Sequence, residues 1–367
     1  MSKQNKPEKQ KKSFSQGQLI WRRFRRHKLG MIGTAAVVLL ILVSIFAPFF
    51  SPYDYTEPEF RKAYTPPQRL RIRDAEGSLT RPFVYGLTQE FDEVTWERVY
   101  VEDETQPYTI RFFTRSWEYN ILGSWTTDIH LFGVDEGGSI YLMGTDHLGR
   151  DMLSRIIFGS RVSLFIGITG ALVSATLGSF MGGLSGYFSG TVDMLVQRLV
   201  EMLQLFPQLP LMMALSAAIP STWPPMGVFL GVVFVLAAVQ WTWLAREVRG
   251  KVLSYREEDF VLATKTAGAS DLYVIIFHIL PNCLSHIIVV LTLTIPNLIL
   301  AESALSFLGL GIQPPMVSWG VLLSNATNLQ TIGDNPWIML PGVIILLTIL
   351  ALNFLGDGLR DAADPYS

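Results

Sequence analysis

The chain has 367 residues, of which 49% are hydrophobic and only 16% are charged, against roughly 25% charged residues in an average soluble domain. Its formal net charge of −2 points to no class of partner. The single cysteine, Cys283, excludes an intrachain disulfide framework and a cysteine-rich metal site, and we expect it to pack as a small apolar side chain. Several stretches as long as a membrane span, about 20 residues, contain no Asp, Glu, Lys or Arg. The middle of the chain is therefore predicted to lie in lipid.

The first 29 residues contain ten Lys or Arg and one acid, Glu8. By the positive-inside rule, this basic N-terminal tail (1–29) is predicted to stay in the cytoplasm. Its second half, residues 19–28, mixes aromatic with basic side chains, which predicts an interfacial helix on the inner surface of the lipid bilayer. Nucleic-acid binding is the other interpretation of such a run, but its position directly before a membrane span disfavours a nucleic-acid partner.

The first membrane helix is predicted over residues 30–50. This apolar run is too long for the hydrophobic region of a signal peptide, and no small-residue cleavage pattern follows it. Residues 51–161 then form a large insert with twelve bases and eighteen acids. The insert is predicted to be extracytoplasmic, because long loops cross the membrane regardless of their charge.

Within the insert, residues 64–143 are predicted to be β-rich. Pro107–Thr114 alternates polar with apolar side chains and contains Tyr, Ile and Phe, as a strand does. Asp128–Val134 and Ser139–Met143 flank a turn signal at residues 135–138, which predicts a hairpin. No catalytic constellation is visible in this region.

Five further membrane helices are predicted over residues 162–184, 197–219, 227–245, 283–301 and 336–356. With the first helix they make an all-α polytopic membrane protein with six transmembrane helices, a membrane core over 162–356 and a cytoplasmic C-terminal tail over 357–367. The charges agree with this layout. The loop 246–282, predicted to be cytoplasmic, carries Arg246, Arg249, Lys251, Arg256 and Lys265, whereas the segments predicted outside, 221–226 and 303–335, contain no Lys or Arg.

Two residues of the spans are candidates for a gate or a pore lining, Pro296 and Glu302. Prolines inside predicted spans (Pro207, Pro210, Pro296 and Pro341) imply kinks that neighbouring helices tolerate. Glu302 is the acid nearest the outer half of the fifth helix, and charges inside a membrane are functional hypotheses by default. It could line a path or contact a gate; the alternative, which we favour, is that it reaches the interface and caps residues 303–311.

Neither a metal site nor a nucleotide site is predicted. Asp146, His147 and Asp151 fit the start of a helix better than a set of metal ligands. His278 and His286 lie on either side of a proline that breaks their common helical face, so a shared metal is not expected.

The glycine-rich segment 182–190 lacks the Lys-Ser/Thr ending of a phosphate-binding loop. Gly250-Lys251 is preceded by Ala245 where that motif needs a glycine, and it is followed by Val252 where it needs a hydroxyl. No cofactor or catalytic residue is therefore expected, and the chain is not its own ATPase.

The cytoplasmic loop 246–282 has helical character without being a span. Acids at residues 257–259 favour a helix start through the helix dipole. Gly268, followed by Ala269-Ser270-Asp271, predicts a sharp turn and a fresh N-cap, and Pro281 is expected to end the second helix where the chain re-enters the membrane. The loop is thus predicted to be a short helix–turn–helix with a flat surface of small side chains.

This loop resembles the "EAA" loop of ATP-binding-cassette (ABC) importer permeases, in which a coupling helix sits in a groove of the ATPase subunit. Gly268 and Leu280-Pro281 match that pattern in spacing. Leu262-Ala263-Thr264 replaces Glu-Ala-Ala, and His278 replaces the Ile. The resemblance implies ATPase-coupling roles for Asp259, Phe260, Ala263, Thr264, Ala267, Gly268, Ala269, Ser270, Asp271, Leu280 and Pro281.

Three other segments are similar to dipeptide and oligopeptide permeases of the DppC/OppC type: Gly144–Leu164, Ala301–Gly320 and Leu355–Pro365. The resemblance covers about residues 22–50 and 144–365, and nothing carries over to the insert. It implies the type I ABC importer permease fold in a bacterial plasma (inner) membrane. It further implies a second homologous permease subunit, two cytoplasmic ATPase subunits and an extracytoplasmic solute-binding protein as partners.

Peptides are the substrates that this resemblance implies, although relatives of the same type also carry nickel, opines or oligosaccharides. An ion-coupled secondary carrier is a rival interpretation. It should show paired intramembrane acids or interrupted helices in symmetric halves, whereas the sequence shows one peripheral acid and no internal repeat. A membrane anchor whose insert binds a partner is a second rival, and it leaves the loop 246–282 unexplained.

Overall fold

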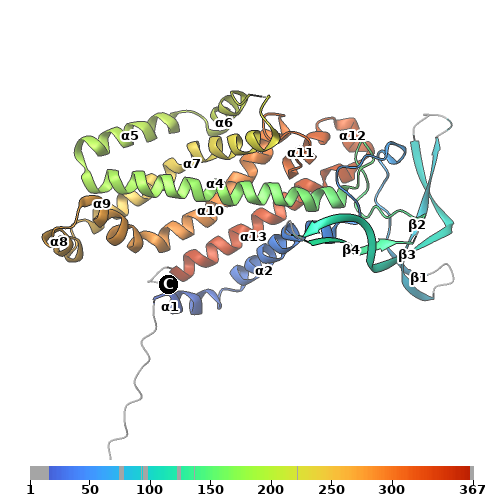
Figure 1. Cartoon of the computed structure of the whole chain (residues 1–367), viewed down its shortest axis with the longest axis horizontal. Helices are drawn as coiled ribbons and strands as arrows, with labels where there is room; N and C mark the ends of the chain where they lie inside the picture. Colours follow the sequence, from blue (N-terminus) through green and yellow to red (C-terminus); the bar gives the residue numbers. More distant parts are fainter. Residues whose placement is uncertain are drawn as a thin grey trace, which may run out of the picture.

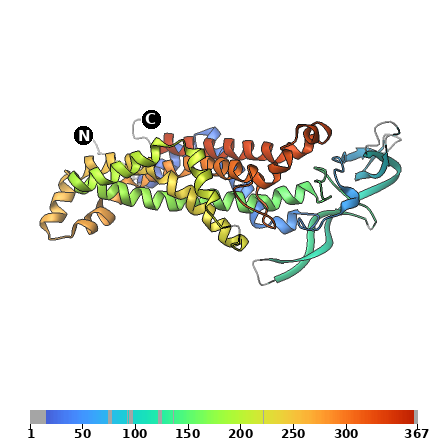
Figure 2. The ribbon, with the colours of Figure 1, turned by 90° about the horizontal axis from the view of Figure 1, so that it is seen from above.

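The computed structural model describes residues 16–73, 78–91, 93, 98–121, 125–135, 137–220 and 222–363. A bundle of long helices runs along the longest axis, with a small β-sheet at one end and the helix α8 (Asp259–Thr266) at the other (Figures 1 and 2). The long helices are α2 (Lys28–Ile45), α4 (Met152–Phe188), α7 (Pro225–Tyr255), α10 (Leu280–Phe307) and α13 (Leu340–Ala363). Within the described part of the chain, the segments that contain these five helices are long and apolar enough to cross a membrane, and a sixth span results if α5 (Gly190–Leu205) and α6 (Gln208–Ala217) count as one.

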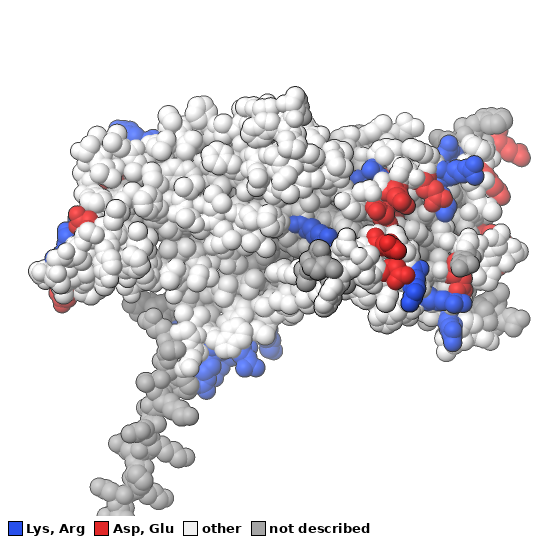
Figure 3. All heavy atoms as spheres, viewed as in Figure 1, with Lys and Arg blue, Asp and Glu red and all other residues white. Residues whose placement is uncertain are grey.

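Charged side chains gather at the two ends of the molecule on the face shown in Figure 3, over the sheet and near α8 and α1. The surface of the helical middle is largely uncharged (Figure 3). This distribution is what a bundle needs if its middle lies in hydrocarbon, where an unpaired charge is costly. It agrees with the prediction of a polytopic helical membrane protein.

Helix ends depart from the predicted ones by several residues. The first predicted helix breaks at Phe46: α2 ends at Ile45, and a single turn, α3 (Ala47–Phe50), follows with a proline in its first turn. The helix α4 begins ten residues before the predicted start and has 37 residues, which is about 55 Å at 1.5 Å per residue. It therefore extends beyond a hydrocarbon core of about 30 Å.

The third predicted span is not one helix. The prediction of a kinked helix over residues 197–219 is wrong, because the chain forms α5 (Gly190–Leu205) and α6 (Gln208–Ala217), which are bent by 91° to one another. Phe206 adopts extended backbone angles (φ −83°, ψ 139°). The cause is Pro207, because the residue before a proline is driven out of the helical region. Arg249 of α7 fastens α5, donating two hydrogen bonds to the Asp193 carboxylate at 2.6 Å each.

Pro281 does not end a helix, contrary to the prediction. The short α9 (Asp271–Val274) continues through a π-helical turn, η2 (Ile275–Ile279), into α10, with Pro281 in the first turn of that helix. Proline lacks an N–H and crowds the preceding turn. The wider π turn accommodates it without a break, so that the predicted second loop helix and the fifth span are one structure.

The insert is β-rich, as predicted, and forms an antiparallel sheet in the order β1-β2-β3-β4. The strands are β1 (Arg71–Arg73), β2 (Leu79–Phe91), β3 (Arg98–Ile121) and β4 (Trp125–Val134). Pro107–Thr114 lies in β3, and β4 pairs with β3 in the register Ile110↔Val134.

The predicted hairpin between Asp128–Val134 and Ser139–Met143 is wrong, because the described residues 139–143 form no strand. Side chains take the place of a partner strand there. The Gln68 Oε1 atom accepts from the Tyr141 N–H at 2.6 Å, and the Tyr53 hydroxyl accepts from the Ile140 N–H at 2.8 Å.

The ends of the chain pack together beside the bundle. The helix α1 (Gln16–Phe24) buries Phe24 against Gly30 of α2 and Gly358 of α13, where the two backbones cross closely. His27 caps α2 by accepting from the Gly30 N–H at 2.9 Å, and its Nε2 lies 3.4 Å from the Asp361 carboxylate. Short elements complete the chain: η1 (Phe60–Lys62), α11 (Trp319–Leu323), η3 (Ser324–Ala326), α12 (Leu329–Asp334) and η4 (Pro336–Met339).

Candidate functional site

The end of the bundle away from the sheet carries α8 (Asp259–Thr266) and α9. Val261 points inward from α8 and is fully buried among Val248 and Val252 of α7 and Val274 and Ile275 of the α9–η2 segment. These residues belong to one apolar cluster that also includes the end of α4. Val261 therefore joins α8 to an apolar cluster that the ends of α4, α7 and α10 share.

Gly268 forms the turn that leaves α8. Its φ angle is +90°, in the left-handed region where only glycine is unstrained. The Gly268 N–H donates to the Lys265 carbonyl at 2.9 Å, and the Ala269 N–H donates to the Thr264 carbonyl at 3.3 Å. This pair of bonds is the Schellman motif of helix ends, so the sequence-predicted turn is confirmed. Ser270 stands at the N-cap position of α9 without a capping hydrogen bond from its side chain.

Polar contacts join the turn to α4. The Tyr187 hydroxyl donates to the Asp271 Oδ1 atom at 2.7 Å, and the Lys265 ammonium lies 3.3 Å from the same oxygen. The Lys265 ammonium also sits 5.1 Å from the centre of the Tyr187 ring. Hydrogen bonding to Tyr187 and then to Asp271 raises the pKa of Lys265 above its ordinary value. The lysine is thus held in its charged form beside the turn.

Most of the residues predicted for coupling are brought together on this end. Phe260, Ala263, Ala267 and Gly268 are exposed, while Thr264 and Ala269 are half-buried. Leu280 packs against the apolar cluster and Pro281 is exposed in α10, away from the turn in sequence. Leu262, which the predicted coupling segment from Asp259 to Asp271 includes, is 50% exposed and follows Phe260 by two residues. An apolar residue exposed beside a buried valine is a signal that the sequence alone does not give.

A second feature is a groove between α6, α7 and α10, made of two hollows. The first has a volume of about 660 Å³ and is lined by α6 (Gln208, Leu209), α7 (Gln240, Trp243, Glu247) and α10 (seven residues from Val290 to Ala304). The second, of about 590 Å³, continues along α7 and the first turns of α10 and reaches Arg360 of α13. Glu247, Val290 and Leu293 line both hollows, so the two form one groove along α7 and α10.

The lining of the first hollow is polar for a surface in the middle of a span. The Gln208 amide donates to the Gln240 carbonyl oxygen at 2.5 Å, and Asn297 is exposed on the opposite wall. Carboxamides facing hydrocarbon are costly, because lipid offers no hydrogen bonds. This face therefore fits water or another polypeptide better than lipid.

Glu247 and His286 meet at the border of the two hollows. The Glu247 carboxylate lies 2.9 Å from His286 Nε2, and this contact bridges α7 and α10. Both side chains keep more than a third of their surface exposed. The sequence alone predicted no role for either residue.

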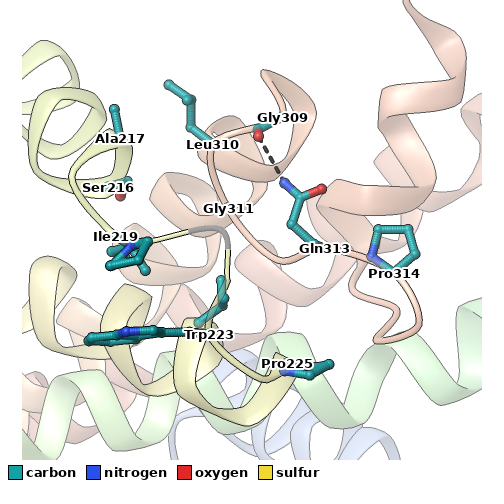
Figure 4. A pocket seen from close by; sticks show the side chains of 12 residues that line it. Ser216, Ala217, Ile219, Trp223, Pro225, Gly309, Leu310, Gly311, Gln313 and Pro314 are labelled. Carbon is teal, nitrogen blue, oxygen red and sulfur yellow. Dashed lines mark hydrogen bonds between the residues drawn. The ribbon is translucent and has the colours of Figure 1, made fainter.

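A third hollow, of about 550 Å³, lies between the α6–α7 connection and the segment that follows α10 (Figure 4). Trp223 and Ile219 form one side, while Gly309 to Pro314 form the other (Figure 4). The Gln313 amide donates to the Gly309 carbonyl at 2.8 Å and holds this loop closed on itself. The hollow lies toward the end of α7 that is remote from α8.

Glu302 and Pro296, the two candidates for a gate, are buried inside the chain and do not line these three hollows. Glu302 accepts a hydrogen bond from the Ser306 hydroxyl at 2.7 Å, and Ser306 in turn accepts from the Ile312 N–H at 3.0 Å. Its other oxygen lies 3.4 Å from the Ser163 hydroxyl of α4. The carboxylate thus holds the segment after α10 from inside that helix, where it is fully buried and reaches no surface.

The segment before α4 is a structural joint. The Asp146 carboxylate pairs with Arg155 and, at 2.8 Å, with Arg150. Burial would raise the pKa of Asp146, but the guanidinium groups of Arg155 and Arg150 outweigh burial and lower it. Asp151 caps α4 by accepting from the Ser154 N–H at 2.7 Å. Among the described residues, no cluster of three or more His, Cys, Asp or Glu could hold a metal ion.

Comparison with known proteins assigns the chain to a family. Residues 174–366 match the model of the binding-protein-dependent transport system inner membrane component. The chain belongs to this family. Residues 15–67 also match the N-terminal transmembrane domain of oligopeptide transport permease C.

Similar relatives extend over nearly the whole chain. The oligopeptide transport system permease protein OppC of Bacillus subtilis is 31% identical over 97% of this chain and 91% of its own length. The dipeptide transport system permease protein DppC of the same organism is 32% identical over 96% of this chain and 87% of its own length. OppC of Haemophilus influenzae is 42% identical over 61% of this chain and 70% of its own length.

Membership fixes the class of the protein. It is a multi-pass permease of the inner membrane and a subunit of an ABC importer rather than an enzyme. A binding-protein-dependent system implies a solute-binding protein and ATPase subunits as partners.

Proposed function

We propose that this chain is one of two homologous permease subunits of an ATP-driven peptide importer, in which the path lies between the two chains. Peptides as cargo follow from the names of the relatives, which are oligopeptide and dipeptide permeases. The proposal takes α5 and α6 as one broken span, which gives six spans and the type I fold. Both termini and the α8 end then face the cytoplasm, and the sheet faces the opposite side, where a binding protein delivers the peptide.

The observation that carries this proposal is the arrangement of α8. An exposed turn of small residues around Gly268 is fastened to the ends of α4, α7 and α10 by buried Val261 and by the Tyr187–Asp271–Lys265 contacts. A surface that must transmit a movement has to be both accessible and firmly joined to the parts that move. The residues from Asp259 to Asp271 meet both conditions, and we assign them to docking on the ATPase subunit.

The groove along α6, α7 and α10 is proposed as this chain's half of the path. Its exposed carboxamides, Gln208 and Asn297, face outward from spans that otherwise expose apolar side chains. A second permease laid against this face would enclose it. The hollow in Figure 4 lies where such a path would open toward the side of the sheet.

The test is purification of the tagged chain from its native membrane in mild detergent, with identification of the proteins that accompany it. We expect one second permease and one or two ATPase subunits. Recovery of the chain alone, or as a homo-oligomer even after gentle crosslinking, contradicts the proposal and favours a carrier.

A variant separates coupling from assembly. Ala263→Trp places a large side chain on the exposed face of α8, so the complex should assemble while peptide no longer stimulates ATP hydrolysis. Gln330→Trp, at an exposed position of α12 near the opposite end, is the matched control. Normal peptide-stimulated hydrolysis in the Ala263 variant would show that α8 does not dock on the ATPase.

A further inference from the structure

We infer that Glu247 and Trp243 form a binding subsite for an ammonium group, such as the amino terminus of a peptide, at the inner end of the first hollow of the groove. This inference rests on the proposed function, because it treats the groove as part of the transport path. It adds the chemical group that the path recognises and the residues that recognise it.

Glu247 is the one charged residue among the residues that line the first hollow. The other polar groups there are neutral: Gln208, Gln240, Thr294 and Asn297. A single carboxylate at the base of a concave and mostly apolar surface focuses its field into the hollow. Cations are attracted to that point and anions are repelled.

Gln240, Trp243 and Glu247 follow one another on α7 at intervals of three and four residues, so they lie on one face of the helix. The Trp243 side chain is 59% exposed and lines the same hollow as Glu247. A carboxylate next to an exposed indole is a suitable site for an ammonium group, because the ring face also attracts cations.

The present partner of Glu247 is exchangeable. His286 occupies the carboxylate at 2.9 Å, from the side of the second hollow. The pair is partly exposed, so an entering ammonium group can replace the imidazole without burying an unpaired charge. The second hollow adds Lys251 and Arg360 to its lining. Its basic character makes Glu247 the innermost point of the groove at which a cation is favoured.

Carboxamides above this point suit the rest of a peptide. Gln208, Gln240 and Asn297 offer both donors and acceptors, which match the N–H and C=O groups of a peptide backbone and disregard its side chains. A path that reads only the amino terminus and the backbone accepts many sequences. This pattern deepens the assignment of peptides as cargo.

The experiment measures the charge preference of the groove without a binding protein. A reporter, Asn297→Cys, is introduced in a Cys283→Ala background, since the native cysteine lines the second hollow. The assembled transporter is placed in nanodiscs, where both faces are open to reagents. Labelling rates are measured with a methanethiosulfonate carrying a trimethylammonium group and with one carrying a sulfonate, each relative to its rate with a small free thiol.

We expect the cationic reagent to be preferred, and we expect Glu247→Gln to reduce this preference about 10-fold, a modest value for electrostatic focusing in a cleft. The matched control is Glu201→Gln, an exposed acid of α5 outside the groove, which should leave the preference unchanged. Dialanine should slow labelling by the cationic reagent, whereas N-acetyl-dialanine, which lacks the ammonium group, should not.

Three other results would contradict the ammonium subsite. A preference that Glu247→Gln leaves intact, or equal protection by both dipeptides, overturns the ammonium subsite and leaves the proposed function standing. A reporter thiol in the Asn297→Cys variant that neither reagent reaches, in a complex that still imports peptides, shows that the groove is not the path. That outcome overturns the subsite and also the placement of the path.

Discussion

A stripe of glycines on α4 allows α7 to approach it closely, and it offers a sharp test of the packing. Gly178, Gly182 and Gly186 are spaced four residues apart and face the backbone of α7. A Cβ atom at Gly182 would lie 2.4 Å from the Ala245 carbonyl oxygen and 3.0 Å from the Val248 Cβ. We predict that Gly182→Ala forces α4 and α7 apart.

The magnitude follows from that distance. Ordinary van der Waals contact begins near 3.4 Å, and the shortest Cβ contact at Gly182 is 2.4 Å, so the helices must separate by about 1 Å. Overpacking of this kind costs roughly 1–3 kcal/mol, and the higher helix propensity of alanine returns about 1 kcal/mol. Loss of close contact along the two long helices adds to the cost, because packing is what holds helices together in lipid. We expect a net loss of about 1–2 kcal/mol.

Gly250→Ala is the matched control. Gly250 also lies inside a long helix, α7, and a Cβ there has no neighbour within 4 Å. Its replacement should be neutral or slightly stabilising, since only the propensity gain remains. The assay is the denaturant midpoint of the purified chain in detergent. Equal midpoints for the two alanine variants would refute the close approach of α4 and α7.

Three further predictions concern other contacts. Burial raises the pKa of Asp151 to about 6 from its ordinary 3.8, so the stability that its protonated form contributes is complete below pH 3.8 and is lost as the pH rises through 6. The Tm of the Asp151→Asn variant should therefore rise relative to that of the parent between pH 5 and pH 7.5. A constant difference between the two Tm values would contradict this. Gln68→Ala should leave the Tyr141 N–H without its side-chain acceptor and cost about 1–3 kcal/mol, seen as faster proteolysis of the insert; unchanged cleavage would contradict it. Val261→Ala should loosen α8 from α7 and lower the number of peptides imported per ATP. Leu262→Ala, at an exposed position, should instead weaken docking on the ATPase subunit. The same defect in both variants would show that burial does not distinguish the two residues.

Hydropathy and charge were enough to predict where most spans lie, because lipid selects long uncharged stretches regardless of tertiary detail. They were not enough at Pro207, where the same apolar composition fits one kinked helix or two helices bent by 91°. They also failed at Pro281, because a π turn that absorbs a proline leaves no mark in composition. In the insert, Gln68 takes the place of a partner strand, and the sequence contains no pattern that predicts this role for a single buried glutamine.

The two candidate sites differ in how far the sequence predicts them. The turn at Gly268 is local, so its glycine and spacing suffice, and the structure adds only that Val261 anchors it and Leu262 does not. The groove is not local, because it depends on which faces of α7 and α10 turn toward each other. The sequence indicates the groove only through the spacing of polar residues from Gln240 to Glu247 and from His286 to Asn297. Averaging hydropathy over a whole span conceals this spacing.

The helix α7 connects the two sites physically. Glu247 and Lys251 on one face line the groove, while Val248 and Val252 on another face pack against Val261 of α8. These residues occupy less than two turns of one helix, so a displacement of α8 cannot reach the buried cluster without acting on the wall of the groove. The start of α10 shares both environments as well, through the buried residues that follow η2. Coupling through this segment would need no long relay, because the cluster that anchors α8 and the lining of the groove lie on neighbouring faces of the same helical segment.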